Sequence, residues 1–563
     1  MRIALSLCLF AALLSAEDNL NTSAPNNLST LSIVNQIKKQ AFDKSQVMET
    51  LFYLTDVYGP RLTASPEFNE AAKWAEERLR SYGVGNVHEE EWGPFGHSWS
   101  VESYAIDMMT PRFSHLAAVP LAWSGPTNGF ITGELMVAAL PEREYDPKKL
   151  ATQNEEYRKK WAGKLKGKII LATTLVRPSP RSKPDFERYS EGDLKEISNA
   201  PTPVLKKPVD WNKIEVPQDP EQRRKFFDSL PEWAFEELWK IYDAERDKLS
   251  TFFRQEGVLA VLKADQRAYN ALDFAEAAGS EKGASLAPPT FVVTEEQYSR
   301  MVRLLDKKIP VTVRVDLKAK DSGKNEMAAN IVGEIPGQGK PDEIVMVGAH
   351  FDSWHTGTGA TDNGAGSAVM MEVMRILAAS RLPLKRTVRI GLWSGEEQGL
   401  LGSKAYIAKH FADPKVMKVS DEHGKFDAYL NFDNGSGKIR GIYLQGNDAA
   451  RALFDQWLQP FRDMGVTTIS LKNTGGTDHL SFDAVGLPGF QFIQDPLDYG
   501  TVTHHSNMDT YSHAIPEDLM QASAVISTLV YDIANRDEMF PRKVLPEPQA
   551  EPAAGQGGPT SAR

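Results

Sequence analysis

Short apolar runs alternate with amphipathic stretches through the second half of the chain. The runs that predict buried strands lie near 344–348, 388–393, 428–432 and 489–493. The stretches with apolar residues at helical spacing lie near 364–379, 402–411, 449–464 and 517–535. Strands that alternate with helices in this way predict an α/β fold. Its sheet would be mainly parallel but mixed, in a three-layer arrangement with helices on both faces.

The first half of the chain begins with a helical pattern over residues 31–82, interrupted once by a Gly-Pro pair. The segment 86–92 that follows suits a strand. We assign 31–124 to the same catalytic domain as the alternating pattern, which occupies 316–540.

Between residues 125 and 315 the sequence pattern differs from that of the flanking segments, which predicts an inserted domain. Strand patterns near 169–173, 257–263 and 291–294 make this insert β-rich. A stretch rich in Pro, Lys and Glu, 178–250, interrupts them and contains a helical patch. We expect this stretch to be a solvated elaboration of the surface rather than a partner site.

Both ends of the chain carry patterns that do not belong to a folded domain. Residues 1–16 combine Arg2, an apolar run and a small-residue end, which is typical of a secretory signal peptide. An uncleaved N-terminal anchor is the alternative. The Asn-, Ser- and Thr-rich segment 17–30 and the Pro-, Gly- and Ala-rich tail 541–563 predict disorder. We therefore expect a secreted or periplasmic protein, without stable membrane insertion after signal removal.

Composition narrows the classes of function. The 563-residue chain has a formal net charge of −11 and no basic arm, which argues against nucleic-acid partners. Its single cysteine, Cys8, lies in the expected signal peptide. The mature chain would then have no disulfide, no thiolate nucleophile and no cysteine-bound zinc.

Residues able to bind a metal follow the predicted strands at or just after their ends. They are His350, Asp362, Glu397, Asp433 and His505. Because the carboxyl ends of parallel strands share one edge of a sheet, these side chains are expected to meet there. Imidazole and carboxylate without thiolate suit a hydrolytic zinc site, either mononuclear or dinuclear. In a dinuclear site one carboxylate must bridge the ions, and Asp362, in a glycine-rich loop, is the candidate.

Three further acidic residues have candidate roles beside these ligands. Glu396 adjoins a candidate ligand, so it can face the attacking water as a general base and pass the proton to the leaving amine. Asp352 and Asp509 are candidates for accepting the second ring N–H of His350 and of His505. The glycine-rich loop lacks the Lys-Ser/Thr of a phosphate loop, and the chain has neither G-x-S-x-G nor H-E-x-x-H.

Several segments in chain order resemble one known family. They read GAHFDSW, TDNGAGS, SGEEQGLLGS, NFDNGSG and HHSNMDT. This series resembles the M28 family of dinuclear zinc exopeptidases. The early segment GPRLTASPEFNEAAKWAEERLRSYGV is similar to a carboxypeptidase subgroup of that family. The likeness covers most of 31–535, is specific in the catalytic part and is looser in the insert, which resembles a protease-associated domain.

The resemblance implies two Zn²⁺ ions and a role for each candidate. The ligands would be His350, Asp433, Glu397 and His505, with Asp362 as the bridge and Glu396 as the general base. The family's cis peptide at an Asp-Asp pair would fall at Asp362-Asn363, where this chain departs from the pattern with Asn. A homodimer is implied as well, although no residue pattern in the sequence shows one.

Two positions stay ambiguous under the resemblance. The family ligand is followed by Thr or Ser, which selects His505 over His504. The residue before the ligand is often a Tyr or His that stabilises the oxyanion, so His504 is a candidate for that role. Asp478-His479 resembles the family's substrate-side loop, but many such pairs are simply hydrogen-bonded turns.

The leading hypothesis is a secreted metallo-exopeptidase that hydrolyses terminal bonds of short peptides or dipeptides, as a carboxypeptidase or dipeptidase. An aminopeptidase with the same ligands is the alternative, because the sequence does not show which terminal charge the cleft recognises. A non-catalytic, receptor-like binding protein is the second alternative. The presence of all five ligands together with Glu396 argues against it.

Overall fold

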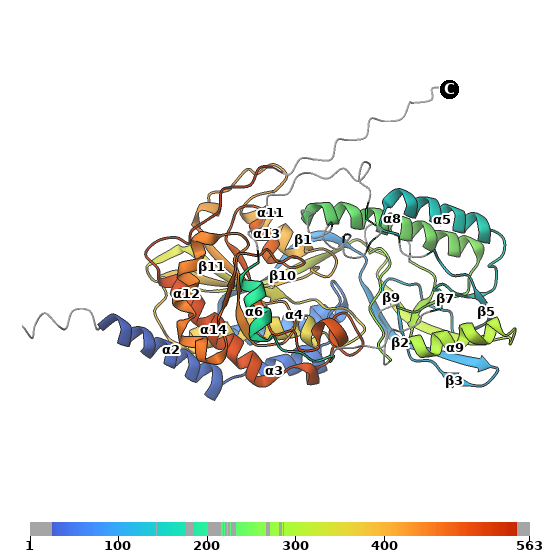
Figure 1. Ribbon diagram of the computed structural model, residues 1–563, viewed down its shortest axis with the longest axis horizontal. Helices are drawn as coiled ribbons and strands as arrows, with labels where there is room; N and C mark the ends of the chain where they lie inside the picture. The colour runs from blue at the N-terminus through green and yellow to red at the C-terminus, as the bar shows by residue number, and fades with distance from the viewer. Residues whose placement is uncertain are drawn as a thin grey trace, which may run out of the picture.

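The chain folds into two bodies that lie next to each other, each built on an eight-stranded sheet (Figure 1). The computed structural model describes residues 25–548, except 142–143, 176–183, 266–270 and most of 201–231 and 281–285. The expected signal peptide therefore lies outside the described residues. Within the described part, no helix is long and apolar enough to cross a membrane.

The first body is built on a mixed sheet. In spatial order its strands are β1 (Gly85–Gly96), β10 (Glu326–Ile335), β12 (Arg386–Trp393), β11 (Lys340–His350), β13 (Phe426–Asn431), β16 (Gly489–Gln494), β14 (Ile439–Tyr443) and β15 (Thr468–Ser470). The four central strands β12, β11, β13 and β16 are mutually parallel. Their carboxyl ends therefore meet at one edge of the sheet, where open α/β folds bind ligands.

Helices cover both faces of this sheet, as the sequence predicts. On one face lie α2 (Pro25–Asp43), α3 (Val47–Phe52), α4 (Pro66–Ser81), α10 (Ala365–Ser380) and α14 (Pro516–Asn535). The other face packs against α11 (Leu401–His410) and α13 (His479–Asp483) (Figure 1). Helix α10 is buried on nearly all sides, as expected for a helix that is apolar around its whole circumference. The three-layer α/β prediction is confirmed.

The second body has its own sheet and core. Its strands, in spatial order, are β3 (Ser114–His115), β2 (Trp99–Thr110), β9 (Thr312–Asp321), β5 (Ile131–Val137), β6 (Ile169–Leu171), β7 (Ala260–Lys263), β8 (Thr290–Val293) and β4 (Ala118–Pro120). The helices α5 (Pro147–Trp161), α8 (Glu232–Glu256) and α9 (Glu295–Asp306) accompany it. Because β2 and β9 pair along their length, this sheet reaches beyond the 125–315 range expected for the insert.

Part of the charged stretch 178–250 is not solvated surface. Its helix α6 (Glu191–Ser198) packs against the first body, where Leu194 is buried with Tyr443 and Ile493. The Ser470 hydroxyl donates a hydrogen bond of 2.6 Å to the Ile197 carbonyl. The expectation of a solvated elaboration is therefore wrong for this helix.

The two terminal segments also differ from expectation where the structure describes them. Helix α2 already begins at Pro25, within the 17–30 segment that was expected to be disordered. Residues 541–548 form no helix or strand, but Arg542 donates a 2.9 Å hydrogen bond to the His423 carbonyl. Lys543 forms a 2.5 Å ion pair with Asp483. The beginning of the tail is thus attached to the first body.

Candidate metal centre

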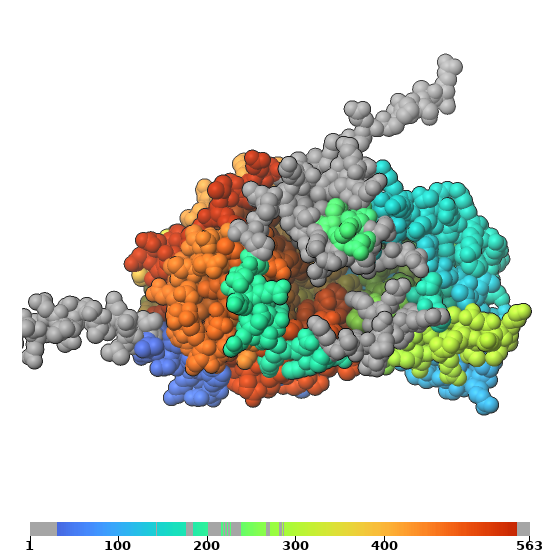
Figure 2. Space-filling view, viewed as in Figure 1, coloured from blue at the N-terminus to red at the C-terminus, as the bar shows by residue number. Residues whose placement is uncertain are grey.

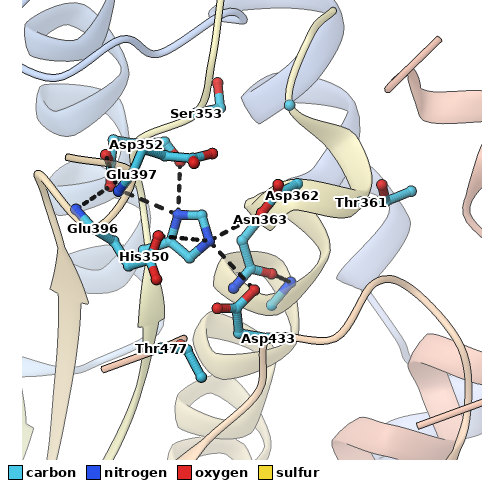
Figure 3. A network of polar contacts seen from close by, with 12 residues as sticks. His350, Asp352, Ser353, Thr361, Asp362, Asn363, Glu396, Glu397, Asp433 and Thr477 are labelled. Carbon is cyan, nitrogen blue, oxygen red and sulfur yellow. Dashed lines mark hydrogen bonds and ion pairs between the residues drawn. The ribbon is translucent and has the colours of Figure 1, made fainter. Parts of the chain in front are cut away.

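The five candidate ligands and Glu396 converge at the carboxyl edge of the first sheet, and Figure 3 labels all of them except His505. His350 is the last residue of β11, and the other residues follow β12, β13 and β16 or lie in the loop before α10. The backbone therefore brings together segments separated by up to about 150 positions, because parallel strands all end at this edge. The structure thus brings together the residues that the strand-end pattern places at this edge.

One group of candidate ligands surrounds His350. Its Nε2 atom lies 3.2 Å from Asp362 Oδ1 and 3.3 Å from Asp433 Oδ1. All three side chains are at least 93% buried, with exposed fractions of 0%, 5% and 7%. These atoms can share one cation, because two ligands at about 2.1 Å from a tetrahedral zinc are roughly 3.4 Å apart.

A second group surrounds His505 and uses the other oxygen of the same aspartate. His505 Nε2 lies 3.2 Å from Asp362 Oδ2 and 3.0 Å from Glu397 Oε2. His504 Nε2 is 3.8 Å from that Asp362 oxygen, and its side chain is 43% exposed. Asp362 therefore lies between the two groups, with one carboxylate oxygen facing each.

The donor atoms themselves show that the site fits a cation. His350 Nε2, Asp362 Oδ2 and Glu397 Oε1 are buried, and none of them has a hydrogen-bond partner within the described part of the chain. Buried polar atoms without partners are costly unless an ion or another group satisfies them. Nitrogen and carboxylate donors without sulfur are the set that hydrolytic zinc sites use.

The pKa values of these groups show the same demand for positive charge. Burial opposes charge on His350, but Asp433 and Glu396 hold its pKa well above the usual value. Burial and the neighbouring Asp362 raise the pKa of Glu397 to about 7. Burial likewise raises the pKa of Glu396 well above its ordinary value. The carboxylates outnumber the imidazoles, and a bound divalent cation would relieve their repulsion.

Asp352 supports the site in a different way from the sequence prediction. His350 Nδ1 is hydrogen-bonded to the main-chain carbonyl of Asp352 at 3.0 Å, whereas the Asp352 carboxylate is 3.6 Å away. That carboxylate instead accepts hydrogen bonds from Thr63 Oγ1 at 2.8 Å and from the main-chain N–H groups of Glu396 and Glu397, each at 3.3 Å. Asp352 therefore orients the histidine by its backbone and fixes the Glu396-Glu397 turn by its side chain.

Asp509 also has a different partner from the predicted one. Its carboxylate accepts hydrogen bonds from the main-chain N–H of Thr361 at 2.6 Å and of Asp362 at 3.2 Å. Thr361 Oγ1 donates a third hydrogen bond, of 2.8 Å. The prediction that Asp509 serves His505 is therefore wrong, because its side chain holds the backbone that presents Asp362.

Asn363 explains how the chain accommodates its departure from the Asp-Asp pattern. The Asp362-Asn363 peptide is cis, as the resemblance implies. The Asn363 amide donates to the Phe432 carbonyl at 2.9 Å and accepts from the Gly366 N–H at 2.9 Å. An aspartate could not make the first of these bonds, so Asn363 connects the Asp362 loop to the residue before Asp433.

Asp478 and His479, the proposed substrate-side pair, are both fully buried. Burial raises the pKa of Asp478 to about 7. His479 Nε2 lies 2.9 Å from Gln445 Nε2 and 3.1 Å from the Thr474 carbonyl. His479 thus has the contacts of a buried turn, whereas both carboxylate oxygens of Asp478 lack a hydrogen-bond partner within the described part of the chain. A substrate role for the pair stays a prediction.

Arg61 is a supporting residue that sequence reasoning missed. It is fully buried, and its guanidinium donates hydrogen bonds to four main-chain carbonyls. These belong to Leu54, Phe351, Thr358 and Gly359, at 2.6–3.1 Å. Burial lowers its pKa to about 10, so Arg61 stays charged at neutral pH. It therefore fixes the 351–359 loop that joins His350 to Asp362; the only sequence signal was its place in the family-like GPRLTAS segment.

Replacement of Arg61 by Met is expected to destabilise the first body by roughly 3–5 kcal/mol, because four buried carbonyls lose their charged donor. Urea unfolding of the variant measures this loss. The exposed Arg112 provides the matched control, and Arg112→Met should leave the free energy of unfolding within about 0.5 kcal/mol of the parent value. Equal stability of both variants would contradict the structural role of Arg61.

Residues 330–530 match the model of peptidase family M28. The chain is 26% identical to carboxypeptidase Q of Mus musculus over 495 residues, which is 88% of this chain and 87% of that protein. It is 28% identical to aminopeptidase YwaD of Bacillus subtilis (strain 168) over 217 residues, 38% of this chain and 46% of that protein.

A solved structure shares the fold. The peptidase M28 precursor from Shewanella amazonensis SB2B superposes with a TM-score of 0.63 at 22% sequence identity. The match covers 92% of this chain and 99% of that one. It therefore spans both bodies and not only the metal-binding edge.

Proposed function

Because residues 330–530 match the model of peptidase family M28, we propose that this chain is a secreted, zinc-dependent exopeptidase of that family acting on short peptides. The observation that carries the proposal is the pair of ligand groups that share Asp362. We assign one zinc ion to His350, Asp433 and Asp362, and a second to His505, Glu397 and Asp362. A homodimer stays a prediction.

When bound, zinc ions polarise the scissile carbonyl and lower the pKa of the attacking water toward about 7. Glu396 is placed to move the proton. Its Oε2 atom lies 3.9 Å from His350 Nε2, and its side chain is 9% exposed, so it borders the ligands and remains reachable. Its carboxylate takes the proton of the attacking water and delivers it to the nitrogen of the leaving amine.

We assign His504 the role of stabilising the negative charge that develops on the carbonyl oxygen of the scissile bond during hydrolysis. Its ring centroid lies 3.9 Å from that of His505 and 4.8 Å from that of Tyr499, and its side chain is partly exposed. A ring N–H in this position can donate a hydrogen bond to the former carbonyl oxygen as charge accumulates there.

Between the two exopeptidase classes, we favour carboxypeptidase or dipeptidase action. Carboxypeptidase Q of Mus musculus aligns with 88% of the chain, whereas aminopeptidase YwaD aligns with 38%. Because the ligand set serves both reactions, the distinction depends on which charged terminus of the peptide is recognised.

Dipeptides blocked at one end test this assignment. For carboxypeptidase action, a C-terminal amide should lower kcat/KM by at least roughly 30-fold, because a recognised terminal charge is lost. N-acetylation should have a much smaller effect, and the unblocked dipeptide is the control in both assays. Hydrolysis that survives the C-terminal amide but is lost on N-acetylation would establish the aminopeptidase alternative instead.

A further inference from the structure

The segment 497–507, which carries His504 and His505, is held from two sides by residues of the 125–315 range. Figure 2 shows the surface hollowed between the first body, in orange and red, and the second body, with α6 along one rim. The contacts on either side of the segment come from residues 185–188 and 271–275. Ligands at this end of the site therefore depend on both bodies.

The first contact is an antiparallel pairing between residues 271–275 and 505–507, here called the clasp. The Ala275 N–H donates to the His505 carbonyl at 2.7 Å, and the Asn507 N–H donates to the Asp273 carbonyl at 2.9 Å. The Asn507 side chain adds two bonds, accepting from the Asp273 N–H at 3.0 Å and donating to the Ala271 carbonyl at 3.3 Å. These bonds fix the register of His505 against the second body.

Apolar side chains from both segments also pack against each other beside the clasp. Leu272 and Phe274 are 4% and 5% exposed, and Val502 packs against them. Such packing stabilises the approach of the two segments but does not define their register. The directional hydrogen bonds of Asn507 and Ala275 therefore determine where the His505 peptide lies.

The second contact lies at the start of the same segment. The Glu187 N–H donates to the Leu497 carbonyl at 2.9 Å, and Thr501 Oγ1 donates to the Asp185 carbonyl at 2.6 Å. Arg188 forms 2.8 Å ion pairs with both Asp495 and Asp518. The segment is thus anchored at both ends.

The backbone of His505 shows why such anchoring matters. His505 has φ = 60°, a left-handed conformation that is uncommon for a residue with a side chain. Conformations of this kind persist when surrounding contacts determine them. The carbonyl that accepts the hydrogen bond from the Ala275 N–H belongs to His505 itself. The clasp therefore fixes the backbone of His505 and, with it, the orientation of the imidazole.

We propose that the clasp is a positioning element for the metal centre, through which the second body completes the His505–Glu397 group. This inference rests on the proposed function. In contrast, the hydrogen bonds made by His350 and by the main-chain N–H of Asp362 go to residues of the first body. The zinc bound through His505 therefore depends on the clasp, and the zinc bound through His350 does not.

The test is Asn507→Ala in the full-length chain, which removes both side-chain bonds of the clasp. During titration with a zinc chelator, the variant should release one zinc per chain at least about 10-fold more readily than the parent chain. The other zinc should keep its parental affinity. The value of kcat should fall as the zinc bound through His505 is lost, and it should recover when zinc is added. Thermal unfolding of the metal-free chain should change little.

The control is Met508→Ala, because Met508 adjoins Asn507 but is 41% exposed; it should release both zinc ions as the parent does. A second variant, Ala275→Pro, removes the N–H that reaches the His505 carbonyl and should reproduce the effect of Asn507→Ala. Parental retention of both ions in the two clasp variants would overturn the proposal, and so would parallel loss of both ions. A parent chain that binds no zinc would instead refute the proposed function.

Discussion

Glu396→Gln is expected to lower kcat by roughly 10²–10⁴-fold while the zinc content stays unchanged. Glutamine has nearly the same shape as glutamate, but its amide cannot accept a proton from the attacking water. The carboxylate of Glu396 lies 3.9 Å from His350 Nε2, beyond the 3.0–3.3 Å spacing within the two ligand groups. Steady-state kinetics and metal analysis on the same preparation measure both quantities.

The matched control is Glu91→Gln, which makes the same chemical change at an exposed position of β1 and should keep parental kcat. Persistent activity of Glu396→Gln would remove Glu396 from the role of general base. Loss of zinc from the variant would place Glu396 among the ligands instead. A parent chain with neither zinc nor chelator-sensitive hydrolysis would support the receptor-like binding protein.

The sequence predicts the ligand cluster because ligand-type residues follow the predicted strands, and the ends of parallel strands lie at one edge of the sheet. His350 is the end of a buried strand, and Asp433 follows the adjacent parallel strand, so both reach the same edge. The place of Asp362 between His350 and His505 follows similarly from the loop after β11. Here, strand periodicity and strand direction were enough to bring distant residues together.

The partners of Asp352 and Asp509 could not be predicted in the same way. Both residues lie near a histidine in sequence, which suggests a direct bond from carboxylate to imidazole. The chain turns after each histidine, so the Asp352 carbonyl faces His350 while the Asp509 carboxylate faces Thr361. Sequence spacing alone does not determine which atom of a residue faces its neighbour.

Arg61 and the clasp were missed because their contacts join segments that are far apart in the chain. Arg61 reaches the carbonyl of Phe351, 290 positions away, and Asp273 bonds to Asn507, 234 positions away. Neither contact has a periodic pattern that marks it. The limits of the insert differ for a related reason, since β2 and β9 flank the 125–315 range and pair with each other.

Asp362→Ala is expected to have the largest effect on metal binding, because one side chain serves both ligand groups. Its Oδ1 lies 3.2 Å from His350 Nε2 and its Oδ2 lies 3.2 Å from His505 Nε2. We expect both zinc ions to bind more than about 100-fold more weakly. This loss exceeds the loss of affinity caused by replacing a residue that only hydrogen-bonds to a metal ligand. Zinc analysis after dialysis, with kcat/KM measured in parallel, gives the result.

The Asp433→Ala variant distinguishes a bridging role of Asp362 from the role of an ordinary ligand to one ion. Asp433 contacts His350 but belongs to only one of the two groups, so its removal should release one zinc and leave the zinc at His505 and Glu397 bound. The exposed Asp421 is the control, and Asp421→Ala should retain both ions. If Asp362→Ala also released a single zinc, Asp362 would be a ligand of one ion, and the second ion would need another carboxylate. Because the main-chain N–H of Asp362 bonds to Asp509 at 3.2 Å, the alanine variant keeps its backbone anchor, and the change in zinc content reports the carboxylate alone.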